Sequence, residues 1–159
     1  MSVTHPQGFV AAGVEAGLKN SGGKDVALVV NQGPAFTAAA VFTANRCKAN
    51  PVLWSEQVVK DGVVRAVFLN SGGANCYTGP EGFRTTHAVA ERVADHLGIG
   101  ALDVVVCSTG LIGLTSPREQ LLGGVDAAHD ALRRDGGLDA ATAILTTDSH
   151  PKQVIVERG

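Results

Sequence analysis

Three polar, glycine-containing segments hold the side chains best suited to chemistry. They are Asn70–Gly79 (NSGGANCYTG), Cys107–Gly113 (CSTGLIG) and Thr146–Lys152 (TTDSHPK). The first two directly follow apolar, strand-like runs, and the third lies between a helical stretch and a last strand-like run. Loops at strand ends are where α/β proteins place their ligands, so these segments form the candidate site.

The segment Ser108-Thr109-Gly110 is the most specific of the three in chemical terms. Gly110 permits a backbone conformation that leaves an N–H unpaired, and Thr109 supplies a hydroxyl donor beside it. Two donors aimed at one point make an oxyanion hole, which stabilises the negative oxygen that forms during acyl transfer. An ordinary strand-to-turn transition, with Thr109 bonded to its own backbone, would use the same residues.

The other two segments are open to more than one interpretation. Asn70 and Asn75 could position the backbone, accept a substrate amine, or build an Asx-type turn. The run Thr146-Thr147-Asp148 could hold the polar end of a substrate, or could satisfy the last carbonyls of the helix before it.

Several common kinds of site are not expected from the motifs. The histidines are scattered and no H-E-x-x-H occurs, so no metal site is predicted. Gly17–Asp25 lacks the spacing of a phosphate-binding loop and is interpreted as a surface turn, and there is no G-x-S-x-G elbow. Asp148, Ser149 and His150 are consecutive, so their side chains cannot converge as a catalytic triad.

Composition predicts one domain over residues 1–159. The chain has 159 residues, of which 45% are hydrophobic and 4% aromatic, with a formal net charge of −2. That is enough for a core, and too near neutrality to attract nucleic acid or anionic lipid by charge. The apolar runs are far shorter than the roughly 20 residues of a membrane span, and no secretory signal is recognisable. Three widely spaced cysteines indicate reduced thiols in a cytoplasmic protein.

The apolar patterns predict an α/β or α+β fold with a mixed sheet flanked by helices. Strands are expected at 25–31, 36–43, 65–70, 103–107 and 153–157. Helices are expected at 80–97 and 138–145, with another between them, in which Ser116 is the N-cap, Pro117 the first residue and Glu119 completes a capping box.

Five segments in this order resemble the bifunctional glutamate/ornithine N-acetyltransferase family of arginine biosynthesis. They are Gly8–Lys19 (GFVAAGVEAGLK), Ala39–Val52 (AAVFTANRCKANPV), Leu69–Gly79 (LNSGGANCYTG), Cys107–Gly113 (CSTGLIG) and Ile144–Lys152 (ILTTDSHPK). Together they span nearly the whole chain, and they resemble the N-terminal α chain of that family.

The resemblance implies a precursor that cleaves itself before a threonine, which then begins a separate β chain. That threonine would take acetyl from N-acetylornithine and pass it to glutamate, and α and β chains would assemble as α2β2. The fold would be of the N-terminal-nucleophile acetyltransferase and aminopeptidase type, completed by the second chain. No resident cofactor is implied, although acetyl-CoA is an alternative donor in some members.

Residue by residue, Thr109 and Gly110 match the family's oxyanion pair, and Thr146 matches a substrate-contacting threonine. Gly73 stands where members more often carry asparagine, which removes any side-chain role there. The segment leading to the cleavage threonine has no match, so no turnover is expected from this chain alone. The competing hypotheses are half of a related N-terminal-nucleophile amidase or aminopeptidase, and a non-catalytic small-molecule-binding module.

Overall fold

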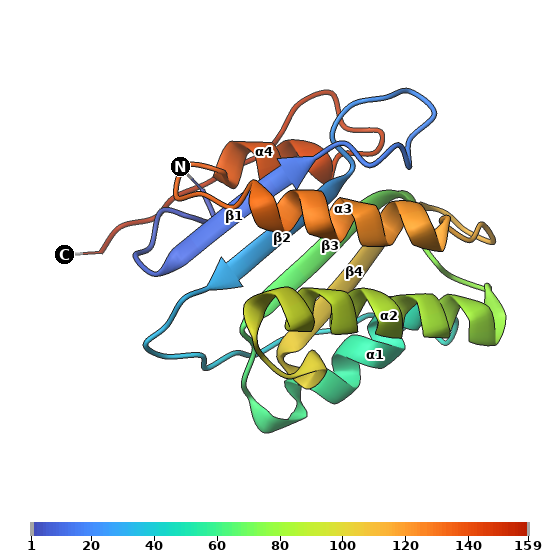
Figure 1. The fold of residues 1–159 in the computed structure, drawn as a ribbon, viewed down its shortest axis with the longest axis horizontal. Helices are drawn as coiled ribbons and strands as arrows, with labels where there is room; N and C mark the ends of the chain where they lie inside the picture. The colour runs from blue at the N-terminus through green and yellow to red at the C-terminus, as the bar shows by residue number, and fades with distance from the viewer. Residues whose placement is uncertain (1, 159) are drawn as a thin grey trace.

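A single four-stranded sheet organises the molecule (Figure 1). The computed structural model describes residues 2–158. The strands lie in the order β1 (Phe9–Val14), β2 (Val26–Asn31), β3 (Ala66–Gly73) and β4 (Val104–Leu111). β2 pairs antiparallel with β1 and β3, whereas β3 and β4 run parallel. The predicted mixed sheet is therefore confirmed.

Helices cover the two faces of the sheet unequally. The helices are α1 (Asn50–Val58), α2 (Gly79–Leu97), α3 (Arg118–Asp130) and α4 (Gly137–Ala143), with short 3-10 turns at Val59–Asp61 and Ala101–Asp103. Figure 1 shows α2 and α3 lying across one face, and α1 runs beside β4. The short helix α4 packs on the opposite face against β1 and β2.

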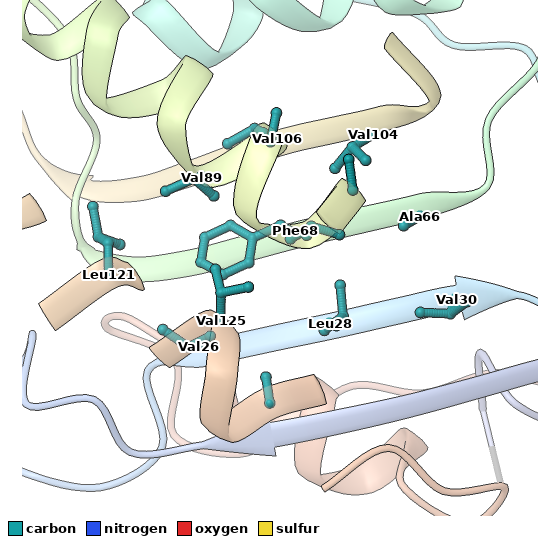
Figure 2. Close-up of a cluster of buried hydrophobic side chains, with 14 of the residues drawn as sticks. Val26, Leu28, Val30, Ala66, Phe68, Val89, Val104, Val106, Leu121 and Val125 are labelled. Atoms are coloured by element: carbon teal, nitrogen blue, oxygen red, sulfur yellow. The ribbon is translucent and has the colours of Figure 1, made fainter. Parts of the chain in front are cut away.

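The main core lies between the sheet and the larger helices (Figure 2). Phe68 of β3 is fully buried at its centre, surrounded by strand residues such as Leu28 and helical residues such as Val89 and Val125. Alternate residues of each strand point to this face, as the period of two requires. Burial of these side chains is the main force that holds α2 and α3 on the sheet.

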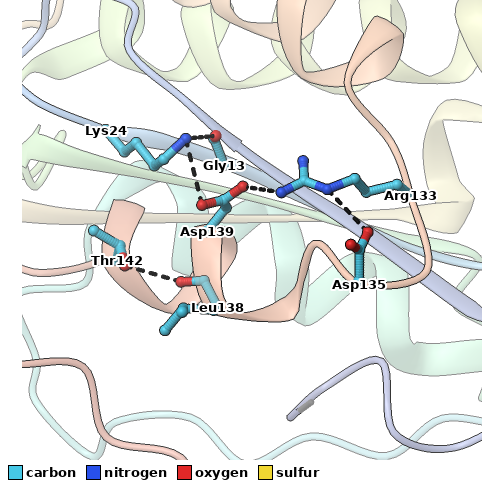
Figure 3. A network of polar contacts seen from close by, with 7 residues as sticks. All are labelled: Gly13, Lys24, Arg133, Asp135, Leu138, Asp139 and Thr142. Atoms are coloured by element: carbon cyan, nitrogen blue, oxygen red, sulfur yellow. Dashed lines mark hydrogen bonds and ion pairs between the residues drawn. The ribbon is translucent and has the colours of Figure 1, made fainter.

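Helix α4 approaches β1 unusually closely. A Cβ on Gly13 would overlap the Asp139 carbonyl, and one on Gly136 would overlap the carbonyl of Ala11, so both positions require glycine. Figure 3 shows how charges complete the contact: Asp139 pairs with both Arg133 and Lys24. The first turn of α4 is thereby fixed to the first strand.

The same face of the sheet is much less covered over β3 and β4. Val67, Leu69, Val105 and Cys107 point to it and are only partly buried, and among them Leu69 packs against the cluster that contains Ala140 and Ala143 of α4. The surrounding apolar side chains do raise the pKa of the Cys107 thiol, because burial disfavours the thiolate. This part of the sheet face is therefore apolar and only partly covered.

Five predicted elements are confirmed, within a few residues at their ends. They are β2 (predicted at 25–31), β3 (65–70), α2 (80–97), β4 (103–107) and α4 (138–145). The strand predicted at 36–43 is wrong: the segment is irregular, and Thr37 forms one isolated bridge with Val63. The strand predicted at 153–157 is also wrong, because these residues are largely exposed and pair with no strand in the described part of the chain. Apolar residues alone do not make a strand without a neighbouring edge.

The start of α3 also differs from its prediction. The helix begins at Arg118, and Pro117 is its N-cap with ψ 121°, so Ser116 lies outside it and makes no capping bond. The extended backbone at Pro117 displaces Ser116 from the amides that it would have to reach. The elements β1 and α1 were not predicted.

Candidate active site

The three residues predicted to form the site lie around one pocket. Thr109, Gly110 and Thr146 line an open cavity of about 370 Å³, together with Lys19, Gly72, Leu111 and Thr147. The structure thus brings together Thr109 in β4 and Thr146 after α4, which lie 37 positions apart in sequence. Thr109 and Thr146 are both exposed, so their hydroxyls are open to a ligand.

Two glycines meet at the carboxyl ends of the parallel strands. In the β3–β4 register, Ser71 is opposite Thr109 and Gly72 is opposite Gly110. Gly110 has φ +131°, and a Cβ there would lie 2.7 Å from the carbonyl carbon of Gly72. Only glycine can adopt this conformation at this separation, so the backbone at Gly110 is accessible from the pocket.

The outer edge of β4 is partly closed by α1. Trp54 Nε1 donates to the Val104 carbonyl at 2.9 Å, and the Ser55 hydroxyl bonds both the N–H and the carbonyl of Val106, at 3.1 and 2.9 Å. Because alternate residues of a strand direct their backbone groups to opposite sides, the N–H of Gly110 faces this outer side as well.

A buried polar contact lies just below the turn. The Ser108 hydroxyl donates to Asn70 Oδ1 at 2.6 Å, and Asn70 is 3% exposed. Asn70 therefore ties β3 to β4 rather than facing the pocket. This contact resolves the first of the open interpretations in favour of backbone positioning.

Asn75 has a structural role of a different kind. Its backbone has φ +51°, and its side-chain amide donates to the Gly82 carbonyl and to Thr86 Oγ1, each at 2.9 Å. The residue thus fixes the entry to α2. It does not line the pocket that contains Thr109.

Thr146 is not needed to satisfy the end of α4. The Ala143 carbonyl accepts from the Ser71 hydroxyl at 2.6 Å, and the Thr142 carbonyl accepts from the N–H of Leu145. Farther along, Lys152 pairs with Asp148 and lowers the pKa of that carboxyl. The segment is thus anchored where it leaves α4, and Thr146 lies at the pocket wall.

Sequence reasoning did not identify Lys19 as a pocket residue, and it included Gly72 only as part of the segment Asn70–Gly79. The turn between β1 and β2 folds around Asp25, which is fully buried and accepts from the backbone N–H groups of Ala16, Leu18 and Lys19 at 2.6, 2.5 and 3.2 Å. This turn contacts Gly72, where a Cβ would lie 2.8 Å from the Leu18 carbonyl oxygen. The only signal in the sequence was an aspartate closing a glycine-rich turn.

Residues 2–158 hold neither a cluster of metal ligands nor a membrane-spanning helix. No group of three or more His, Cys, Asp or Glu side chains is placed to hold a metal ion. No helix among them is long and apolar enough to cross a bilayer.

Comparison with known sequences gives consistent matches. The model of the ArgJ family matches residues 10–159. The arginine biosynthesis bifunctional protein ArgJ of Streptomyces coelicolor is 61% identical over 158 residues, which are 99% of this chain and 41% of that protein. The protein of the same name from Thermobifida fusca is 59% identical over 96% of this chain and 40% of its own length. The chain therefore spans about two fifths of these relatives.

Solved structures agree with the sequence matches. The structure of ornithine acetyltransferase complexed with ornithine from Mycobacterium tuberculosis has a TM-score of 0.92 at 54% identity, over 93% of this chain and 80% of that one. The arginine biosynthesis bifunctional protein argJ from Bacillus halodurans has a TM-score of 0.84 at 33% identity, over 94% of this chain and 78% of that one.

Proposed function

The chain belongs to the ArgJ family, and we propose that it is the α-chain part of an ornithine acetyltransferase, supplying the oxyanion hole. The carrying observation is that Thr109, Gly110 and Thr146 line one pocket at the carboxyl ends of β3 and β4. In this proposal the Thr109 hydroxyl and the Gly110 N–H stabilise the negative oxygen, and Thr146 contacts the substrate.

The proposed reaction has two steps. A threonine hydroxyl attacks the acetyl carbonyl of N-acetylornithine, the carbonyl electrons move onto oxygen, and collapse breaks the C–N bond. Ornithine leaves after its nitrogen takes the hydroxyl proton, and an acetyl ester remains on the threonine. The amine of glutamate then attacks the ester and gives N-acetylglutamate. The threonine oxygen leaves the acetyl group and takes the proton lost by the glutamate nitrogen, which regenerates the hydroxyl. Both tetrahedral intermediates carry the charge that Thr109 and Gly110 are proposed to stabilise.

The nucleophile is proposed to come from a partner. An N-terminal threonine can use its own amine as the base, and the proposed partner is a β chain of the same precursor that begins with such a threonine. Leu111, Ile112 and Leu114 beside the pocket are 66%, 65% and 52% exposed, which favours a covering chain. We propose an α2β2 assembly in the cytoplasm.

The proposed reaction requires no resident cofactor, because acetyl passes directly between two amino acids through the threonine. Acetyl-CoA as an alternative donor is a separate property. It is tested by adding acetyl-CoA and glutamate without N-acetylornithine and measuring N-acetylglutamate.

The test of the function is acetyl transfer by the chain assembled with its partner. N-Acetylornithine labelled in its acetyl group is supplied with glutamate, and the products are identified by mass spectrometry. Labelled N-acetylglutamate is the expected product. Free labelled acetate in its place would indicate an N-terminal-nucleophile hydrolase, and binding without turnover would indicate a binding module.

A further inference from the structure

We infer that Lys19 forms an anion subsite of this pocket, which binds the carboxylate of the amino-acid substrate. The inference rests on the proposed function and adds a specificity residue to it. It begins from two neighbouring cavities: the pocket of Thr109, and a second of about 400 Å³ between the β1–β2 turn and the segment before α3. The residues common to both are Lys19, Gly72 and Leu111.

Lys19 is the one charged residue among those that line either cavity. The other polar groups of the first pocket are the threonine hydroxyls and the backbone at Gly110. These can recognise an acyl group or an amine, but they supply no full positive charge. Within residues 2–158, Lys19 is therefore the cationic group that these two cavities offer to a substrate carboxylate.

The ammonium group of Lys19 is not neutralised within the described residues. It is partly buried and donates to the Lys24 carbonyl at 2.9 Å, but forms no ion pair there. By contrast, Lys24 pairs with Asp139 and Lys48 with Glu56. Asp25, the nearest carboxylate along the turn, is already bound by three backbone N–H groups. Lys19 thus keeps spare donors and its charge for a ligand.

The position of Lys19 is fixed relative to the oxyanion turn. Its own N–H is bound by Asp25, and the preceding residue packs on Gly72. Gly72 in turn lies opposite Gly110 in the strand register. These successive backbone contacts fix the position of the Lys19 Cα relative to Gly110. A charge held at a fixed place by the main chain binds with less loss of conformational entropy than one on a mobile loop.

The ligand is identified by its chemistry as an α-carboxylate. In the proposed reaction both the donor and the acceptor are amino acids, so each presents this group while its amide or amine lies at the threonine hydroxyls. A hydrogen bond to a charged group contributes about 1.5–3 kcal/mol, equivalent to a roughly 10- to 150-fold change in an equilibrium constant.

The test compares N-acetylornithine with N-acetylputrescine, the same molecule without its carboxylate, in the chain assembled with its partner. We expect Lys19→Met to lower kcat/KM for N-acetylornithine by about 10- to 100-fold, mainly through KM, and to leave N-acetylputrescine nearly unchanged. Lys19→Arg should retain most of the activity. Lys60→Met, which removes an exposed lysine in the 3-10 turn after α1, is the matched control and should not change either value.

Three results would overturn the inference: no loss in Lys19→Met, an equal loss for both donors, or a selective change in KM for acetyl-CoA, which would indicate a phosphate contact. Calorimetric titration with ornithine and with putrescine separates this inference from the proposed function, because it needs no turnover. If the unmodified protein transfers no acetyl, the proposed function fails. The Lys19 assignment then stands only if Lys19→Met weakens the binding of ornithine and not that of putrescine.

Discussion

The Ser71 hydroxyl donates a hydrogen bond to the Ala143 carbonyl at 2.6 Å, joining β3 to the end of α4. Ser71 is fully buried and lies opposite Thr109 in the strand register. Ala143 is the last residue of α4, and Thr146 follows it by three positions. One hydrogen bond therefore sets the distance between the two walls of the pocket.

Replacement of Ser71 tests that bond. In Ser71→Ala the carbonyl of Ala143 loses its partner in a buried place, so we expect the free energy of unfolding to fall by about 1–3 kcal/mol. Urea unfolding followed by circular dichroism measures the change. Ser21→Ala, at an exposed position of the β1–β2 turn, is the control and should lie within about 0.5 kcal/mol of the parent chain. Equal effects of the two substitutions would contradict the structural role of Ser71.

Two glycine substitutions should change the free energy of unfolding in opposite directions. Gly110→Ala places a Cβ against the backbone of Gly72 at a positive φ, and should destabilise the fold by about 1–3 kcal/mol or more. Gly123→Ala meets no atom within 4 Å on the exposed side of α3, and should stabilise it by up to about 1 kcal/mol. Thermal unfolding of both variants under one set of conditions decides the matter. A stabilised Gly110→Ala would show that the close approach to Gly72 is absent in solution.

The elements that local pattern could predict are those that pack on both sides or present a clear helical stripe. Two examples are the strand with Val104–Val106 and the helix with Val89 and Val93. Each can be predicted from its own residues, because the spacing of its apolar side chains shows which of them are buried. β1 (FVAAGV) was missed because its small residues serve close approach to α4 rather than bulk burial. Such a contact depends on a segment more than a hundred residues away, which no local window contains.

The candidate site was predictable in part for the same reason. Thr109 and Gly110 follow an obvious strand, so their place at a strand end could be expected. Asn70 and Asn75 looked equally suitable, and only their own burial and their hydrogen bonds to Ser108 and Thr86 assign them to structure. Lys19 enters the pocket through the β1–β2 turn, whose path is set by the buried Asp25. The path of this turn depends on tertiary contacts, so a local sequence pattern could not predict it.

Thr109 gives the direct test of the proposed oxyanion hole. Thr109→Ala removes one donor to the developing negative oxygen, so kcat for acetyl transfer should fall about 10²–10³-fold with little change in KM. Thr109→Ser keeps a hydroxyl and should recover most of the rate. Steady-state kinetics of both variants, assembled with the partner, make the comparison. An unchanged kcat in Thr109→Ala would remove this residue from the oxyanion hole.

The exposed apolar side chains beside the pocket predict how the chain behaves by itself. Leu111, Ile112 and Leu114 are exposed beside one another at the end of β4, so the chain alone should self-associate and bind an apolar dye. Sedimentation velocity with and without the proposed partner measures this. Ile112→Ser should reduce the self-association, whereas Gln153→Ser, an exposed polar change, should not. A monomer that binds no dye would count against a covering chain.

The ion pair between Arg133 and Asp139 predicts loss of stability in acid (Figure 3). Arg133, helped by Lys24, lowers the pKa of the Asp139 carboxyl below its ordinary value near 3.9. A carboxyl whose pKa is lower in the folded state stabilises the protein above its unfolded-state pKa, and this contribution disappears as the pH falls through its folded-state pKa. We therefore expect Asp139→Asn to lower the unfolding midpoint at pH 7 and to converge on the parent chain at the acidic end of a series from pH 7 to pH 2. Asp130→Asn, an exposed carboxyl at the end of α3, is the control. A constant difference between Asp139→Asn and the parent at every pH would show that packing of the side chain, and not its charge, fixes α4 to β1.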